Sequence, residues 1–467
     1  MVAQNSPPTP GAPSAAALPQ TLQQFSAVQW RDYLQSGAAD LPALSGQALS
    51  YAQAADQRLH VFADLDQRVI ELQADHLHQQ RMRGEPAGPL FGVPVAVKDI
   101  IDTVDFPTAY GSPIHSGRYA VADATVVRRL RGAGAMIFGK TVTTEFATFH
   151  PGPTCNPHNP AHTPGGSSSG SAAAVAAGLV PLALGTQTNG SVLRPASFCG
   201  VYGFKPTRGV LPRTGVFEQS PALDQLGVFS RTLEDAALAV EIMSGDDGQD
   251  EASRAIAPRR LWATCMAEPP VTPKFCFVRT PWWSQIDAEA REAYEEFLSL
   301  MRGVVVTAEL PPVVEQAVLW HQAVNEAELA FALQREYLHH PQQLSPALRE
   351  RVAQGMQMPV NDYLVARDRI PHVARAFDEF FEHFDAILSP AALGAAPAGL
   401  ASTGNPLMQT VWTFAGLPSV SLPLFTLSGG MPLGLQAVGA LHNDGRLLRS
   451  CRWLVQQTVV SDSEGTA

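Results

Sequence analysis

The sequence predicts an α/β fold in which a large mixed, mostly parallel central sheet is covered by helices on both faces. Helix and strand signals alternate from about residue 93 to residue 231, the pattern of layered α/β proteins. Two further strand-like runs, at residues 384–390 and 418–423, are expected to complete the sheet. Charged residues make up only 16% of the chain and glycines number 37, which favours a tightly packed interior.

The N-terminal part is predicted to be scaffold. Residues 1–20, rich in Pro, Ala, Ser and Gln, predict a disordered lead-in, and no Lys or Arg precedes Arg31, so the basic start of a secretory signal is missing. Apolar spacing over residues 27–80 predicts helices with polar outer faces. We expect one domain over residues 21–460 and a short tail at 461–467.

A short buried strand then ends in a charged pair. Residues 90–97 contain a β-branched run that is followed directly by Lys98 and Asp99. A lysine at the end of a buried strand is poorly solvated, which lowers its pKa. An ion pair between Lys98 and Asp99 is the simpler alternative. The next unit, residues 124–140, predicts a helix and then a strand, the reverse of the order that a dinucleotide-binding fingerprint requires.

The second half of the chain predicts a cover over this core. Residues 244–260 read as an acidic loop, and residues 287–302 as an amphipathic helix. We therefore expect a catalytic core at 93–231 and a helical cover at 260–384 that contributes to the substrate pocket. A last helix is predicted near residues 447–456.

Bulk properties exclude several classes of partner. A net charge of −11 and a pI near 5.6 exclude a broad basic surface for nucleic acid or anionic lipid. The longest apolar run, residues 172–184, is too short for the roughly 20 residues of a membrane span. Five scattered cysteines predict neither a disulfide framework nor a zinc site. We expect a cytoplasmic protein with a small-molecule substrate and no cofactor or metal, and leave a homodimer open.

Two loops of small residues form the predicted chemical centre. Residues 164–171 lead into a helix of tiny side chains, and residues 185–191 follow an apolar strand. Loops at the same edge of a parallel sheet lie side by side. Asn189 and Gly190 tolerate a positive φ, so Thr188, Asn189 and Gly190 are predicted to form a nest of N–H donors beside Ser191. Such a nest has the form of an oxyanion hole.

The run from Gly165 to Pro206 resembles the signature of the amidase signature family, and it includes the sequence Gly200-Val201-Tyr202-Gly203-Phe204-Lys205-Pro206-Thr207. Similarity extends to residues 93–112, 134–147 and 430–447. The resemblance implies the fold of that family and amide hydrolysis. It also implies a catalytic triad in which Ser191 is the nucleophile, Ser167 the bridging serine after a cis peptide bond, and Lys98 the base.

The chain departs from the family pattern near the nucleophile. Gln187 replaces an acid found in many members, and Asn189 stands where glycine is usual, which would crowd the hole unless Asn189 is left-handed. An arginine often follows the nucleophile by two positions, whereas here Leu193 occupies that position and Arg194 comes third. An anion-binding role and a structural ion pair are both open for Arg194.

Two other functions compete with this hypothesis. Residues 166–170 satisfy the pattern G-x-S-x-G, which would make Ser168 the nucleophile of an α/β-hydrolase-type esterase, although no strand precedes it directly. A non-catalytic or partner-dependent amidotransferase-type subunit is the second alternative. His158 and His162 are expected at the surface.

The substrate is expected to be a hydrophobic or aryl-bearing amide. The large aromatic residues of the second half are expected to pack in the core or to line a pocket, with core packing favoured: Trp282, Trp283, Trp320, Phe331 and Trp412.

Overall fold

The computed structural model describes residues 20–253 and 260–464. Nearly all of the predicted lead-in, residues 1–19, lies outside the described residues, as do the acidic-loop positions 254–259 and the end of the predicted tail, 465–467.

Within the described residues, an 11-stranded sheet runs through the molecule in the order β1-β3-β2-β4-β6-β5-β10-β11-β9-β7-β8. The strands are β1 (Phe62–Asp64), β2 (Pro94–Lys98), β3 (Met136–Thr141), β4 (Leu182–Gln187), β5 (Tyr202–Lys205), β6 (Gln225–Ser230), β7 (Phe275–Val278), β8 (Val305–Ala308), β9 (Ala386–Pro390), β10 (Ser419–Leu427) and β11 (Met431–Val438). Among these strands, β2 pairs in parallel with β3 and β4, and β7 with β8 and β9, while the other pairs are antiparallel. The expected mixed α/β sheet is confirmed.

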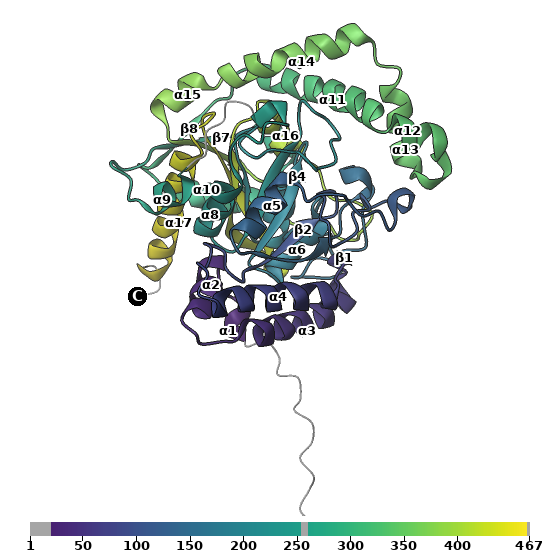
Figure 1. Cartoon of the computed structure of the whole chain (residues 1–467). Helices are drawn as coiled ribbons and strands as arrows, with labels where there is room; N and C mark the ends of the chain where they lie inside the picture. Colours follow the sequence, from purple (N-terminus) through teal and green to yellow (C-terminus); the bar gives the residue numbers. More distant parts are fainter. Residues whose placement is uncertain (1–19, 254–259, 465–467) are drawn as a thin grey trace, which may run out of the picture.

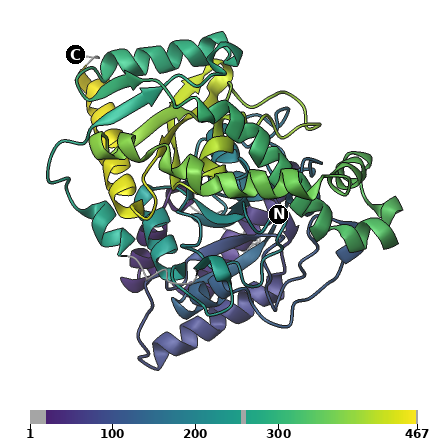
Figure 2. The same cartoon turned by 90° about the horizontal axis from the view of Figure 1, so that it is seen from above.

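Helices enclose the sheet and gather at two ends of the molecule (Figure 1). They are α1 (Gln20–Gln23), α2 (Ala27–Gln35), α3 (Leu41–Leu59), α4 (Gln67–Met82), α5 (Thr125–Gly132), α6 (Ser169–Ala176), α7 (Leu193–Cys199), α8 (Leu233–Met243), α9 (Leu261–Met266), α10 (Ala288–Leu300), α11 (Val313–Ala332), α12 (Gln334–His339), α13 (Pro346–Gly355), α14 (Val360–Arg375), α15 (Asp378–His383), α16 (Leu407–Phe414) and α17 (Asp444–Glu464). Helices α2–α4 lie at one end and α11–α15 at the other. In the view from above, the green helices of residues 313–383 cross over the rest of the chain (Figure 2). None of the helices within the described residues is long and apolar enough to cross a membrane.

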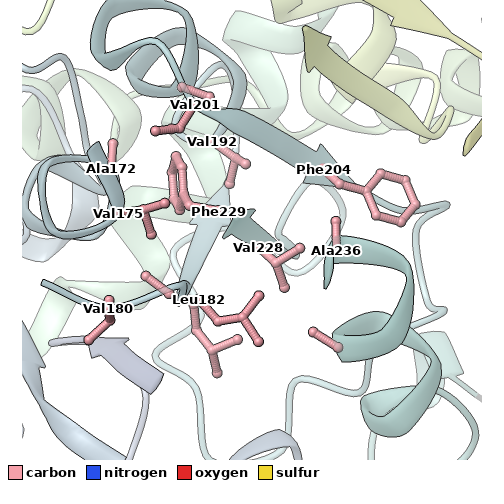
Figure 3. Packing of buried hydrophobic residues seen from close by; sticks show 14 of the residues in the cluster. Ala172, Val175, Val180, Leu182, Val192, Val201, Phe204, Val228, Phe229 and Ala236 are labelled. Atoms are coloured by element: carbon pink, nitrogen blue, oxygen red, sulfur yellow. The ribbon is translucent and has the colours of Figure 1, made fainter. Parts of the chain in front are cut away.

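Strand β6 shows how the sheet is buried on both faces. Figure 3 shows consecutive side chains pointing to opposite sides, with Phe229 towards Val175 of α6 and Val228 towards Ala236 of α8. All four residues are at most 1% exposed. Because both faces are covered, β6 is an unbroken buried run, which is why its sequence shows no polar alternation.

The small residues of α6 allow it to lie close to the sheet, as the sequence predicts. A Cβ atom added at Gly170 would lie 2.2 Å from the Val61 carbonyl oxygen and 2.6 Å from the Val142 nitrogen. A larger residue would push α6 away from the start of β1 and the end of β3, the strand next to β2. This close approach places the start of α6 beside the C-terminal ends of β2 and β4, where the functional residues gather.

The segment 260–384 is less helical than the sequence predicts. It contains the strands β7 and β8, which extend the sheet beyond β9. Each strand has only four residues, and a short apolar run such as Phe275–Val278 cannot be assigned from periodicity alone. The helices α11–α15 form the remaining cover.

Candidate active site

Lys98 is the last residue of β2, the strand that lies between β3 and β4 in the sheet. Its side chain is fully buried. Its Nζ atom lies 2.7 Å from Ser167 Oγ and 2.7 Å from Thr186 Oγ1. Burial lowers the pKa of Lys98 well below its ordinary value, and the negative charge of Asp224 partly opposes this effect. The alternative pairing of Lys98 with Asp99 is wrong, because the Asp99 carboxylate lies 3.4 Å from Lys140 Nζ instead.

Ser167 lies in the loop before α6, and the Gly166–Ser167 peptide bond is cis. The Ser167 side chain is almost fully buried, with 2% exposure. The Ser167 carbonyl oxygen accepts a hydrogen bond from the Thr144 amide, which fixes the loop against the segment that follows β3. Its hydroxyl therefore faces Lys98 from a restrained backbone.

Ser191 lies between the end of β4 and the start of α7. The buried Gln187 side chain organises this turn: Oε1 accepts hydrogen bonds from the amides of Val192 and Leu193, at 2.8 and 3.0 Å. Nε2 of Gln187 donates to Thr413 Oγ1 at 2.9 Å. The neutral amide that replaces the usual acid thus supplies an acceptor to buried N–H groups at the start of α7 that have no partner within the helix.

Three consecutive amides next to the nucleophile have no acceptor in the described protein. Among the hydrogen bonds of residues 20–253 and 260–464, none is donated by the main-chain nitrogen of Asn189, Gly190 or Ser191. Buried main-chain N–H groups are rarely left unpaired in folded proteins. The three amides belong to residues that line one cavity, so they are available to a bound oxygen atom.

The conformation of this loop differs from the expected nest. Neither Asn189 nor Gly190 has a positive φ. The Asn189 side chain does not crowd the hole, because its Oδ1 accepts a hydrogen bond from Thr410 Oγ1 at 2.8 Å and is turned towards α16. Gly190 is needed for space: an added Cβ would lie 2.7 Å from Gln409 Oε1 and 2.9 Å from Arg194 Nη1.

Arg194 forms no ion pair with any described residue. Its guanidinium is buried and donates to the main-chain oxygens of Gly166, at 2.6 Å, and Thr403, at 2.7 Å. Burial lowers the pKa of Arg194 to about 9. Arg194 therefore joins the loop of Ser167 to the turn of Ser191 through carbonyl groups, which rules out the ion pair that the sequence left open.

Ser191 lines a cavity of about 20 Å³ that adjoins a larger one of about 290 Å³. The two cavities share Phe149, Asn189, Asn325 and Pro406. The larger cavity is lined mainly by polar side chains, which include His321, Gln322, Glu326, Arg351, Asn405 and Thr410. Another cavity, of about 370 Å³, lies near Arg279 and Glu315 and shares no residue with these two.

None of the five large aromatic residues singled out in the sequence lines the cavities beside Ser191. Trp412 is 2% exposed and packs in the core, as expected. The expectation is wrong for Phe331, which is 80% exposed on α11. His158 is exposed and His162 half-buried, and the ring of each contacts a main-chain carbonyl, of Cys199 and Ala396 respectively.

The geometry does not favour Ser168 as a nucleophile. Ser168 is fully buried, and its Oγ contacts the main-chain oxygen and nitrogen of Thr186, both at 3.3 Å. No histidine within the described ranges forms a hydrogen bond with it, and it does not line the cavity of Ser191. Thr186 is the neighbour of Lys98 that the sequence analysis missed, although it lies on β4, the strand next to that of Lys98.

Comparisons with known proteins agree with this arrangement. The family model described as Amidase matches residues 46–448. Over 463 residues the chain is 30% identical to a glutamyl-tRNA(Gln) amidotransferase subunit of Synechococcus sp. (strain WH7803), covering 90% of this chain and 94% of the relative. It is 32% identical over 445 residues to a 1-carboxybiuret hydrolase subunit of Pseudomonas sp. (strain ADP), covering 89% and 94%.

The fold comparison points the same way. The native peptide amidase of Stenotrophomonas maltophilia superposes with a TM-score of 0.81 at 26% identity, covering 93% of this chain and 97% of that one. Sequence and fold thus agree over nearly the whole described chain, and the relatives include enzymes that cleave amide bonds. The chain belongs to the amidase signature family and is an amide hydrolase by that membership.

Proposed function

We propose that the protein hydrolyses carboxamides through an acyl-enzyme on Ser191, with Ser167 and Lys98 as a proton relay and without an imidazole. The observation that carries this proposal is the 2.7 Å contact between Lys98 Nζ and Ser167 Oγ in a fully buried setting. A serine hydroxyl needs a base that is unprotonated near neutral pH. A lysine whose pKa is lowered by burial meets that need.

In the first half of the reaction, Ser191 Oγ attacks the amide carbon and its proton passes to Ser167, whose own proton passes to Lys98. The amides of Thr188, Asn189, Gly190 and Ser191 stabilise the oxyanion, with the unpaired amides of the last three as the main donors. Protonated Lys98 then returns a proton through Ser167 to the departing nitrogen, and ammonia or an amine leaves.

In the second half, water attacks the acyl carbon and gives its proton to the same relay. The carboxylic acid leaves and Ser191 recovers its proton. Ser191 Oγ donates to no described residue, so the proposal requires the Ser191–Ser167 contact to form in the substrate complex, where catalytic hydrogen bonds usually shorten.

The expected hydrophobic or aryl substrate is not favoured by the cavity. Its lining is mainly polar, and Phe149 is the one large aromatic side chain among the described residues that line it. A polar lining leaves hydrogen-bonding groups unpaired when a hydrocarbon occupies the site, and this costs affinity. We therefore propose a small polar amide as the substrate.

The test uses Ser191→Ala and an active-site probe. Wild-type protein is expected to hydrolyse members of a panel of small polar and aryl amides, and Ser191→Ala to lose that activity. A fluorophosphonate probe is expected to label Ser191, mapped by mass spectrometry, and to leave Ser168 unlabelled. Unchanged hydrolysis by Ser191→Ala, or labelling of Ser168, would refute the mechanism.

A second candidate function is work within a larger enzyme that has several chains. Both sequence relatives are named as subunits, one of an amidotransferase and one of a hydrolase. Hydrolysis of the same amide panel with glutamine added, together with the mass of the purified chain in solution in the same buffer, distinguishes the candidates. Steady turnover by a monomer or homodimer supports an independent amidase, whereas an inert chain supports dependence on a partner.

A further inference from the structure

Helix α11 of the cover contacts residues 188–191, called the oxyanion loop below, through His321. His321 is a buried residue that the sequence analysis did not single out. His321 Nε2 lies 2.9 Å from the main-chain oxygen of Thr188, and the side chain is 3% exposed. A carbonyl oxygen only accepts, so Nε2 carries the proton of this hydrogen bond. Burial lowers the pKa of His321 to about 4, so the ring is neutral at pH 7 and Nδ1 carries no proton.

The position of the Thr188 carbonyl controls the direction of the next amide. The Thr188 carbonyl and the Asn189 N–H belong to one planar trans peptide and point in opposite directions. A hydrogen bond that fixes the carbonyl therefore fixes the amide. The Asn189 amide is the first of the three that have no acceptor in the described protein.

The following peptide is fixed in the same way from α16. Thr413 Oγ1 donates to the Asn189 carbonyl at 2.5 Å, and this fixes the direction of the Gly190 amide. The direction of that hydrogen bond is unambiguous, because Thr413 Oγ1 also accepts from Gln187 Nε2 and its own proton must go to the carbonyl. Two consecutive amides are thus oriented by side chains distant in sequence.

The side chain of Thr188 is held as well. Its Oγ1 donates to Asp224 Oδ1 at 2.5 Å, and Asp224 Oδ2 accepts from the amides of Gln219 and Ser220, at 2.7 and 2.8 Å. Thr188 is therefore held by its side chain and by its carbonyl, and the hydrogen bond to the carbonyl restrains rotation of the Thr188–Asn189 peptide. Of these two restraints, only His321 comes from the cover.

We propose that His321 is a positioning residue for the oxyanion hole, which it serves from the cover helix by orienting the Thr188–Asn189 peptide so that the Asn189 amide faces the developing oxyanion. The inference rests on the proposed function, because it requires chemistry at Ser191. His321 acts through Thr188 and contributes no proton to the reaction.

The test compares three substitutions that differ in where they place a donor. A glutamine side chain puts its amide nitrogen near the position of Nε2, whereas asparagine reaches only the position of Nδ1. We expect His321→Ala and His321→Asn to lower kcat by about 100-fold, the lower end of the loss caused by removing one oxyanion donor. His321→Gln is expected to retain most of the wild-type kcat. KM is expected to change little in all three His321 variants. His372→Ala, an exposed histidine of α14, is the control and is expected to keep wild-type kcat.

A second readout separates orientation of the oxyanion hole from general packing. Methylboronic acid forms a tetrahedral adduct with an active serine and places an oxygen in the oxyanion hole. Its inhibition constant is expected to rise about as much as kcat falls in His321→Ala, whereas inhibition by the carboxylic acid product stays within about twofold of wild type. Thr413→Val is expected to show the same losses of kcat and of boronic acid inhibition, whereas Thr413→Ser, which keeps the hydroxyl, is expected to behave like wild type. This second pair of variants tests the inference if a His321 variant does not fold.

Failure of the inference differs from failure of the proposed function. If Ser191→Ala is inactive but His321→Gln loses as much kcat as His321→Ala, the positioning role is wrong while the mechanism stands. A raised KM with unchanged kcat in His321→Ala would make His321 a substrate-binding residue and overturn the inference. Activity that survives Ser191→Ala would remove the proposed function itself.

Discussion

Lys98 and Lys140 lie on neighbouring strands, and both side chains are fully buried, yet their surroundings differ in one decisive respect. Lys98 meets two hydroxyl groups, those of Ser167 and Thr186. Lys140 meets the Asp99 carboxylate, the main-chain oxygens of Ile101 and Pro107, and one hydroxyl. A hydroxyl donates and accepts, whereas a carboxylate or a carbonyl only accepts. Only Lys98 therefore has partners that can hand a proton to a neutral amine without a carboxylate beside it to hold the ammonium form.

Lys205 shows that a lowered pKa alone does not make a base. Burial lowers its pKa to about 7, and that of Lys140 to about 8. The partners of Lys205 Nζ are the oxygens of Pro206, Gln225 and Leu417, none of which can donate. Its amine is used as a donor that joins β5 to its neighbours. Burial prepares an amine to lose its proton, but the chemistry of the partners decides whether it receives one.

The largest expected effect is a contrast between activity and stability. Lys98→Met is expected to lower kcat/KM by about 100- to 10,000-fold, the contribution of a general base, while the free energy of unfolding falls by about 1–2 kcal/mol for two lost hydrogen bonds. Lys140→Met leaves the Asp99 carboxyl buried without its cation and is expected to lower the unfolding free energy by about 3–5 kcal/mol. Urea denaturation and steady-state kinetics measure both quantities. The comparison fails if the two variants lose activity and stability in the same proportion.

A smaller effect is expected at Gly190, where the oxyanion loop has no room for a side chain. Gly190→Ala places a methyl group within 3.0 Å of Gln409 Oε1, Arg194 Nη1 and Pro406 Cβ. The oxyanion loop must shift, and we expect kcat to fall by about 10- to 100-fold. The pH dependence of kcat/KM, which reflects Lys98, is expected to stay unchanged. Gly46→Ala, in α3, is a matched control for the loss of a glycine, because Gly46 also lacks a positive φ and an added Cβ there has open space. Wild-type kcat in Gly190→Ala would show that the loop does not need its present position.

The smallest effect is expected at Thr186, which contacts Lys98 but has no part in the proposed proton relay. Thr186→Val removes one of the two hydroxyl partners of Nζ, and we expect kcat/KM to fall by about tenfold because the amine loses orientation. Thr186→Ser keeps the hydroxyl and is expected to retain activity within about twofold. Equal losses in both variants would assign Thr186 a packing role instead.

Local sequence patterns predicted much of the fold. The strand that ends at Lys98, the helix and strand of residues 124–140 and the small-residue helix before β4 all follow from short-range signals. The strands β7 and β8 did not, because each has only four residues and lies among helices. The exposed position of Phe331 depends on how α11 packs against its neighbours, and an aromatic residue in a helix gives no signal of that packing.

The site was predictable where its residues follow buried strands. Ser191 follows β4 and Lys98 ends β2, so sheet geometry alone brings them to one edge. His321 is 133 positions from Thr188, and no local pattern links the two residues. The φ values of Asn189 and Gly190 were not predictable either, because tolerance of a positive φ does not require one.

The central claim, that Lys98 is a neutral amine when the enzyme works, is tested most directly by the pH dependence of kcat/KM. A base must be unprotonated, so activity is lost as pH falls through its pKa and is fully present above it. Because burial holds the pKa of Lys98 well below 10.5, we predict that kcat/KM rises along a single-proton limb and reaches a plateau well before pH 10. A rate that continues to rise up to pH 10, or the same limb in Lys98→Met, would contradict the account.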